Sequence, residues 1–291
     1  MKNLELLKRK VIKYYDQEAK DYVAMYDKGY KGYPANQIRL NFIAKRLKKN
    51  RIKKVLDAGC GSCSTIIKLL KEGFQVKGFD ISKEMVKEGK EYIQRRGYDP
   101  ALIFKADLEN KKSLPKERFD AVVALGVFPH VLNEGKALRN MRDLLKPKGR
   151  VFIEFRNDLF AAYTLNKYSL DFFLNRALDL NSLPKTVSGE VVNFYSERFN
   201  LDKPNKRGNG RLIYTDIMAK FKNPLSIERE LFKKNGFSVM KIHFYHYHAL
   251  PPIFQNRYPK LFRKLSLKME KPDDWRGYLM ASAYVVEAVK N

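Results

Sequence analysis

The stretch that decides the fold is Val55-Leu56-Asp57-Ala58-Gly59-Cys60-Gly61-Ser62-Cys63-Ser64. It begins with apolar residues, passes through a Gly-x-Gly turn, and leads into apolar side chains at helical spacing, which are Ile66, Ile67, Leu69 and Leu70. Gly59 and Gly61 allow a sharp bend and let a ligand approach the backbone. The helix that follows offers unpaired N–H groups to an anion such as a carboxylate. The sequence therefore predicts a strand, a glycine-rich turn and a helix that form a cofactor pocket, with Asp57 able to accept hydrogen bonds from the loop or to attract a cation.

The residues downstream of this turn narrow the kind of cofactor. A nicotinamide-binding turn has a third glycine, and Ser64 stands in its place. A second strand, 75–82, carries Asp80, whose carboxylate can take both ribose hydroxyls of a nucleoside. A third strand ends at Ala106-Asp107-Leu108, which places Asp107 where an adenine amine could lie. Residues 119–126 are nearly all apolar, as expected of a strand buried on both faces, and 145–154 predict a turn into a fifth strand.

At these positions the chain resembles the class I S-adenosylmethionine-dependent methyltransferases. The resemblance runs from residue 53 to about 156, returns after 225, and is closest to the small-molecule branch that includes the ubiquinone-biosynthesis and amino-sugar methyltransferases. It implies an α/β fold, in which a Rossmann-like, seven-stranded, mostly parallel sheet has helices on both faces, an antiparallel last strand and inserted cap segments. It also implies S-adenosyl-L-methionine as cofactor, bound by Tyr15, Tyr22, Asp57, Gly59, Gly61, Asp80, Ile81, Asp107, Leu108 and Leu125.

Length and charge suggest additions to that core and an anionic partner. A chain of 291 residues exceeds a single methyltransferase core. Lys and Arg total 58 against 32 acids, a formal net charge of +26. This excess of positive charge favours an anionic partner, which would be nucleic acid, a phosphorylated or nucleotide-linked metabolite, or a membrane surface.

Cys60 and Cys63 lie inside the glycine-rich turn and lack a second ligand pair, so we discount a zinc or redox role. Without a signal-peptide pattern or a membrane-spanning apolar run, we expect a cytoplasmic protein.

The expected organisation follows from where the core pattern stops and resumes. Residues 1–50 should form N-terminal helices that close the cofactor pocket, and residues 51–157 and 224–291 should form the core. Residues 158–223 should form an inserted substrate cap, with a smaller insertion at 249–278. Within the cap, 188–195 and 211–214 are interpreted as strands of a small added sheet. The basic run 45–54 is interpreted as a solvated face, and Gly29, Tyr30, Gly32 and Tyr33 as a loop that could act as a lid.

The fourth strand ends in Leu125-Gly126-Val127-Phe128-Pro129-His130-Val131, where related enzymes place residues beside the transferred methyl. The Asn/Asp-Pro-Pro-aromatic motif of base-amine methylation is absent here, and both cysteines lie too far away for cytosine C5 chemistry. Glu154 has no evident partners of the Lys-Asp-Lys-Glu set used in ribose methylation. His130 could act as a general base, with an unperturbed pKa of ~6.5. Alternatively, it orders the loop through a backbone hydrogen bond.

His246 and His248 are the other candidate catalytic residues. They should share one face of the strand 238–247, with His243 on the other face, and one of them should face the substrate cleft. A zinc site would need a third ligand on their face, and none lies nearby in the sequence, so no metal is predicted. The basic, amphipathic segment 249–271 could lie on a membrane, with Phe254 and Phe262 inserted, or pack on the core.

These observations predict methyl transfer to an O or N atom of a small metabolite, which we expect to be anionic. A sugar on an anionic or lipid-linked carrier would suit the charge. Two alternatives stay open, an RNA methyltransferase and a non-catalytic cofactor-binding protein. Nucleic-acid binding is less favoured, because the base-modifying motifs are missing, and peripheral membrane contact is possible.

Overall fold

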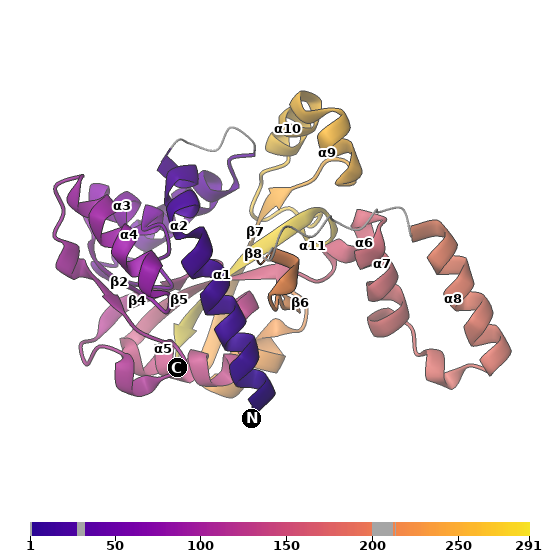
Figure 1. The fold of residues 1–291 in the computed structure, drawn as a ribbon, viewed down its shortest axis with the longest axis horizontal. Helices are drawn as coiled ribbons and strands as arrows, with labels where there is room; N and C mark the ends of the chain where they lie inside the picture. The colour runs from indigo at the N-terminus through magenta and orange to yellow at the C-terminus, as the bar shows by residue number, and fades with distance from the viewer. Residues whose placement is uncertain (1, 28–32, 200–211, 213) are drawn as a thin grey trace.

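The computed structural model describes residues 2–27, 33–199, 212 and 214–291. Its central sheet has the strand order β3-β2-β1-β4-β5-β8-β7, and β6 pairs with β5 (Figure 1). Strands β1 to β5 run parallel, whereas β8 is antiparallel to both of its neighbours. The expected Rossmann-like sheet with its antiparallel last strand is confirmed. The strands are β1 (Lys54–Ala58), β2 (Gln75–Asp80), β3 (Ile103–Lys105), β4 (Phe119–Ala124), β5 (Leu145–Asn157), β6 (Phe221–Lys222), β7 (Phe237–Tyr247) and β8 (Ala281–Lys290).

Helices and short turns connect these strands. The α-helices are α1 (Lys2–Asp27), α2 (Ala35–Lys49), α3 (Ser64–Lys71), α4 (Lys83–Gln94), α5 (Glu134–Leu144), α6 (Phe160–Thr164), α7 (Lys167–Phe172), α8 (Lys185–Phe199), α9 (Ile253–Arg257), α10 (Pro259–Lys268) and α11 (Gly277–Met280). The short 3-10 or π turns are η1 (Pro100–Leu102), η2 (Lys111–Ser113), η3 (Phe128–His130), η4 (Phe173–Ala177), η5 (Leu180–Ser182), η6 (Tyr214–Asp216), η7 (Glu228–Phe232) and η8 (Lys233–Asn235). Gly236 follows η8 with φ +81°, the left-handed conformation in which glycine commonly ends a helix.

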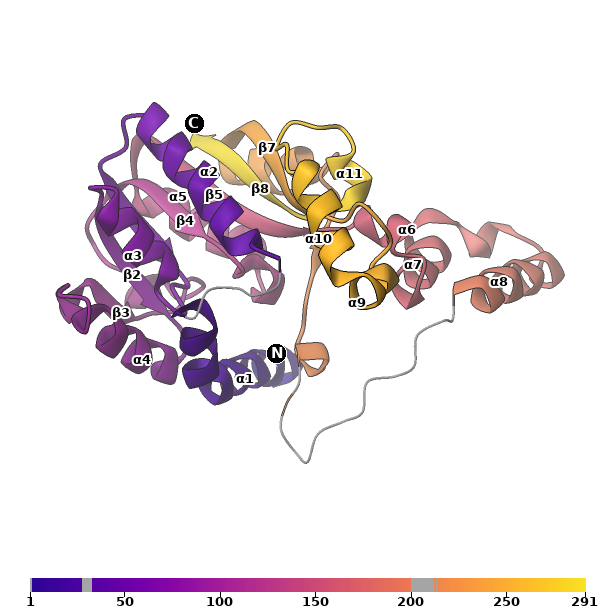
Figure 2. The ribbon, with the colours of Figure 1, turned by 90° about the horizontal axis from the view of Figure 1, so that it is seen from above.

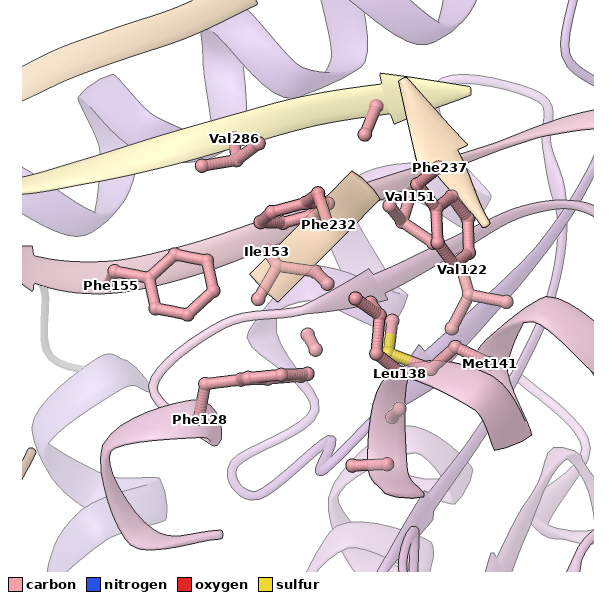
Figure 3. Close-up of a cluster of buried hydrophobic side chains, with 14 of the residues drawn as sticks. Val122, Phe128, Leu138, Met141, Val151, Ile153, Phe155, Phe232, Phe237 and Val286 are labelled. Carbon is pink, nitrogen blue, oxygen red and sulfur yellow. The ribbon is translucent and has the colours of Figure 1, made fainter. Parts of the chain in front are cut away.

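Two hydrophobic clusters bury the two faces of the sheet. On one face, Leu138 and Met141 of α5 and Phe232 of η7 pack on Val122, Val151 and other strand residues (Figure 3). On the other face, α2, α3 and α4 contribute Ile43, Leu47, Ile66 and Ile93. The central strands are therefore buried on both faces, which explains their nearly continuous apolar sequences.

Residues 185–199, between β5 and β6, form helix α8, so the prediction of a strand at 188–195 is wrong. These residues belong to α8, in which Val187, Val191 and Tyr195 recur at the four-residue spacing of a helix. Tyr195 stacks on Phe173 of η4, with 5.1 Å between ring centroids. None of the α8 residues is buried, and Figures 1 and 2 show this helix lying away from the sheet. The second predicted strand, 211–214, lies largely outside the described residues; Tyr214 begins η6.

The basic run 45–54 is more than a solvated face, because several of its cations are paired. Arg46 binds Glu287 through two hydrogen bonds of 2.6 and 3.0 Å. Arg150 and His243 contact the same carboxylate, which is fully buried in β8. Burial alone would raise the pKa of Glu287, but the hydrogen bonds from His243 and Arg46 outweigh it and lower the pKa to about 2. Part of the basic excess therefore stabilises the packing of α2 on the sheet.

The insertion after β7 forms α9 and α10 and packs partly on the core. Phe262 is only 3% exposed, which agrees with the alternative that this segment packs on the core and leaves Phe262 unavailable for membrane insertion. The exposed large apolar side chains of α9 and α10 are Ile253, Tyr258, Leu261 and Leu267, and Tyr258 and Leu261 are the most exposed, at 55% and 49%. None of the helices in the described parts of the chain is both long enough and apolar enough to span a membrane.

Candidate functional site

The glycine-rich turn after β1 forms one wall of a first cavity of about 130 Å³. Gly59 has φ +83° and Gly61 has φ +44°, conformations that side chains with a Cβ rarely adopt. Asp80, at the end of β2, accepts the N–H of Gly61 and the N–H of Ser82, both at 2.9 Å. Helix α3 then begins without a side-chain cap, so the N–H groups of its first turn have no partner of that kind. The turn thus faces the cavity with backbone donors and one carboxylate.

Asp57 lies beneath this turn, not in the cavity wall. Its carboxyl group is 1% exposed, and one of its oxygens has no hydrogen-bond partner among the described residues. Burial raises the pKa of Asp57 to about 7, with a further contribution from Asp80 and a partly opposing one from Arg39. The carboxyl group is therefore poised to change charge near neutral pH.

Helix α1 crosses the same cavity and contributes Tyr15 and Tyr22 to its wall. Lys8 anchors the helix, because its Nζ lies 2.5 Å from Asp107 and 3.1 Å from Glu109. Asp16, which follows Tyr15 directly, accepts a hydrogen bond from the Ser82 hydroxyl at 2.5 Å. Of the residues predicted to bind the cofactor, the structure brings nine to this cavity: Tyr15, Tyr22, Gly59, Gly61, Asp80, Ile81, Asp107, Leu108 and Leu125.

His130 lies in the wall between the first cavity and a second one. Its Nδ1 is 2.6 Å from the carbonyl oxygen of Met218, so Nδ1 carries the proton and donates it. Its Nε2, 3.0 Å from the Tyr15 hydroxyl, is then the acceptor. Burial lowers the pKa of His130 to about 4, well below the value expected from the sequence. The imidazole is therefore neutral near pH 7 and, as one alternative had suggested, makes a backbone hydrogen bond.

The second cavity, of about 1220 Å³, adjoins the first and shares Tyr15, Leu125 and His130 with it. Its wall includes Glu154 and Arg156 of β5, and His246 and His248. The two imidazole rings lie side by side, with 4.9 Å between centroids, whereas His243 stacks on Phe42 and contacts Glu287. Burial lowers the pKa of His246 to about 4 and that of His248 to about 3.

Several residues of this site were not singled out from the sequence. Arg39 of α2 forms an ion pair with Glu154, and the two side chains are 12% and 11% exposed. The guanidinium of Arg156 lies 4.7 Å from the ring centroid of Tyr214. For Arg156 a signal existed, because it follows the last apolar residue of the fifth strand, at the edge where α/β sheets bind ligands. The sequence contains no such signal for Arg39 and Tyr214, because their positions next to β5 depend on tertiary packing.

Comparisons with known proteins point to one family. A family model described as a methyltransferase domain matches residues 56–153. The ubiquinone biosynthesis O-methyltransferase of Proteus mirabilis is 29% identical over 188 residues, which is 64% of this chain and 75% of that protein. The enzyme of the same name from Serratia proteamaculans is 28% identical over 139 residues, 48% of this chain and 57% of that one. The chain thus spans about three quarters of the first relative and little more than half of the second.

A solved structure extends the likeness in fold to nearly the whole chain. It is the complex between the Haloferax volcanii Trm112 methyltransferase activator and a methyltransferase. The TM-score is 0.51 and the sequence identity 15%, over 95% of this chain and 97% of that chain. At this identity, the likeness concerns the fold.

Proposed function

The chain belongs to the class I S-adenosylmethionine-dependent methyltransferases, and we propose that it methylates an O or N atom of a small anionic metabolite. The observation that carries this proposal is the second cavity, which opens against the first and shares part of its wall. A cofactor held in the first cavity and an acceptor held in the second would meet beside Tyr15, Leu125 and His130. Most of the rate would then come from proximity and alignment, worth up to ~7–11 kcal/mol in favourable cases.

The residues of the first cavity fit S-adenosyl-L-methionine. Asp80 retains lone pairs for the ribose hydroxyls beside its two backbone hydrogen bonds. Asp107 and Leu108 would flank the adenine, and the first turn of α3 would receive the methionine carboxylate. Asp57 would act from beneath the turn as a counter-charge for the cofactor's cationic groups. When bound, the cofactor supplies an electrophilic methyl group.

Tyr15 and His130 would handle the proton that an O–H or N–H acceptor loses. As the acceptor gives its proton to the Tyr15 oxygen, Tyr15 gives its own to Nε2 of His130, and an imidazolium results. The lowered pKa of His130 makes the imidazole a weak base, so positioning would contribute more than proton removal. His246 and His248 are neutral for the same reason and suit hydrogen bonding better than proton transfer.

The segments between β5 and β7 would form the cap over the acceptor, with a smaller contribution from the 249–278 insertion. Cap residues that line the second cavity include Phe160, Thr164, Lys167, Tyr168, Asp171, Arg176, Tyr214, Lys220, Pro252 and Gln255. Lysines and arginines outnumber acids in the cavity wall, which favours an anionic acceptor. Such an acceptor could be a sugar on a nucleotide or lipid carrier, or another acidic metabolite.

Labelled methyl transfer to fractionated metabolite pools tests the function. We expect label in a small acidic metabolite, and a strong loss of transfer in Asp80→Asn. S-adenosylhomocysteine at 100 times its Kd should stabilise the protein by about 2.7 kcal/mol, whereas NAD should not. A melting shift with NAD alone, or label found only in RNA, would contradict the proposal.

A further inference from the structure

The wall of the second cavity carries two polar groups of different character. One is Arg156, a permanent cation, and the other is His246, an uncharged imidazole. The register of the sheet places Arg156, Ala283 and Tyr245 in one row across β5, β8 and β7. His246 follows Tyr245 directly, and both Arg156 and His246 line the cavity.

Arg156 keeps its charge available because the nearby acid has another partner. Glu154 lies two residues earlier on the same face of β5, but Arg39 holds it in an ion pair. Within the described part of the chain, Arg156 makes no ion pair, and its guanidinium lies against the ring of Tyr214. A guanidinium supported by an aromatic ring at a cavity wall is suited to bidentate binding of a carboxylate or phosphate.

His246 is held with one ring nitrogen as an acceptor. The Ser282 hydroxyl oxygen lies 2.9 Å from Nδ1 and 3.3 Å from the carbonyl oxygen of His246. Both contacts are hydrogen bonds only if Nδ1–H donates to the hydroxyl oxygen and the hydroxyl donates to the carbonyl. Nε2 then carries the lone pair. Tyr33 stacks on the same ring at 5.0 Å and fixes its plane.

The backbone at His246 has a strained conformation, which determines the direction of its side chain. Its φ is +58°, a conformation that costs roughly 1–3 kcal/mol for a residue other than glycine. The strain lies within β7, between Tyr245, which pairs with Ala283, and Tyr247, which pairs with Ala281. A chain selected only for stability would favour glycine or asparagine here.

We propose that Arg156 and His246 together select an acceptor that carries both an oxyanion and a hydroxyl group. Arg156 binds the oxyanion, and Nε2 of His246 accepts the hydroxyl hydrogen. This inference rests on the proposed function, since it assigns the second cavity to the acceptor. It adds that the cavity recognises two groups on one molecule, and that neither half alone is a good ligand.

Two trios of probes test the inference by calorimetry in the presence of S-adenosylhomocysteine. The carboxylate trio is 3-hydroxybenzoate, benzoate and 3-hydroxybenzamide. The phosphate trio is glycerol 3-phosphate, propyl phosphate and glycerol. In at least one trio the first member should bind about tenfold more tightly than either of the others, as one added hydrogen bond or ion pair allows. The trio that responds identifies the oxyanion.

Variants of Arg156 and His246 then test which group of the ligand each residue binds. Arg156→Met should abolish the preference for the anion and keep that for the hydroxyl, and His246→Phe should do the reverse. His246→Asn, which tolerates the left-handed backbone, serves as a second variant in case the phenylalanine protein folds poorly. Lys241→Met removes a cation paired with Asp273 outside the cavity and should change neither preference.

Unchanged preferences in the Arg156 and His246 variants would overturn the inference. Failure of all six probes to bind at about 10 mM would also overturn it, because fragments of this size held by such contacts should bind in the millimolar range. Transfer of labelled methyl is measured separately. Probe selectivity without any methyl transfer would leave the two-point recognition intact and contradict the proposed function instead.

Discussion

Gly59 meets two constraints at once, one from its backbone and one from its neighbour. Its φ is +83°, and a Cβ there would lie 2.3 Å from Cγ2 of Val127. Gly73 has a similar φ of +88° but nothing within 4 Å of the Cβ position. Alanine substitutions at Gly59 and Gly73 can therefore be compared. At Gly73 only the left-handed backbone costs stability, whereas at Gly59 a clash with Val127 is added.

We predict that Gly73→Ala lowers the free energy of unfolding by about 1–2 kcal/mol, the cost of the backbone conformation alone. Gly59→Ala should lose a further ~1–3 kcal/mol, because Val127 must move. It should also weaken S-adenosylhomocysteine binding, which Gly73→Ala should not. Urea unfolding and calorimetry give both quantities. Equal losses in the two variants would show that Val127 yields freely.

Single histidines also set the response of stability to pH. His248 has two ring nitrogens with no hydrogen-bond partner among the described residues, and burial lowers its pKa to about 3. The unfolded chain binds this proton near pH 6.5, whereas the folded protein does not. The folded state therefore loses stability as the pH falls below about 6.5.

His248→Phe should remove this dependence and relieve the unpaired nitrogens. We predict that the variant is more stable than the parent at pH 7.5, by about 1–3 kcal/mol. The difference should widen by about 2 kcal/mol at pH 5, since one pKa unit corresponds to ~1.4 kcal/mol. Asp57, with its raised pKa, shifts stability in the opposite sense, but equally in both proteins. A difference that is constant with pH would mean that His248 is protonated in the folded state.

At the scale of elements, α1 carries Tyr15 and Tyr22 to the wall of the first cavity. Its ion pairs from Lys8 to Asp107 and Glu109 join it to the loop after β3, and the side chains of Lys8 and Asp107 are 23% and 26% exposed. Partly exposed pairs contribute modestly, in the range of ~0.2–1 kcal/mol. The helix that carries Tyr15 is therefore held in place by interactions that a single substitution can weaken.

Lys8→Met should loosen α1 and weaken S-adenosylhomocysteine binding by about two- to fivefold, in line with a loss below ~1 kcal/mol. Arg9→Met is the matched control, because Arg9 pairs with Glu5 on the exposed side of the same helix. Calorimetric titration of both variants provides the measurement. Tighter binding in Lys8→Met would instead mean that Lys8 competes with the ligand for Asp107.

At the scale of the whole molecule, the basic side chains behind the net charge of +26 have more than one role. Some cations hold elements together, as Arg46 does with Glu287, and others line the second cavity. Lys260 and Arg263 of α10 are exposed, and neither lines the second cavity. The loop that contains Lys206 and Arg207, the other basic segment of the caps, lies outside the described residues.

We therefore predict that Lys260→Glu combined with Arg263→Glu leaves methylation of a soluble acceptor within a few-fold of the parent. Lys233→Glu with Lys234→Glu makes the same change in net charge on the exposed η8 turn and serves as control. RNA binding by either protein should be sequence-tolerant and should fall steeply with salt. Saturable, site-specific methylation of RNA that only the α10 variant loses would favour an RNA methyltransferase.

The sequence by itself determined the central sheet and the order of its ligand-facing loops. Each of these features is local, because a short apolar strand followed by a glycine or an acid can be recognised in a few consecutive residues. The carboxyl ends of parallel strands meet at one edge, so Asp80 and Asp107 could be placed together without a structure. Their roles toward the cofactor remain predictions.

Only the tertiary structure decided which distant residues share the second cavity and in what charge state. Arg39 neutralises Glu154 and leaves Arg156 available, a relation between α2 and β5 that no local pattern contains. Burial shifts the pKa of His130 from the ordinary value to about 4, and Phe262 turns out to be buried. Helix α8 replaced a predicted strand, since β-branched residues at helical spacing fit either structure. The common reason is that burial and pairing depend on residues far apart in the chain.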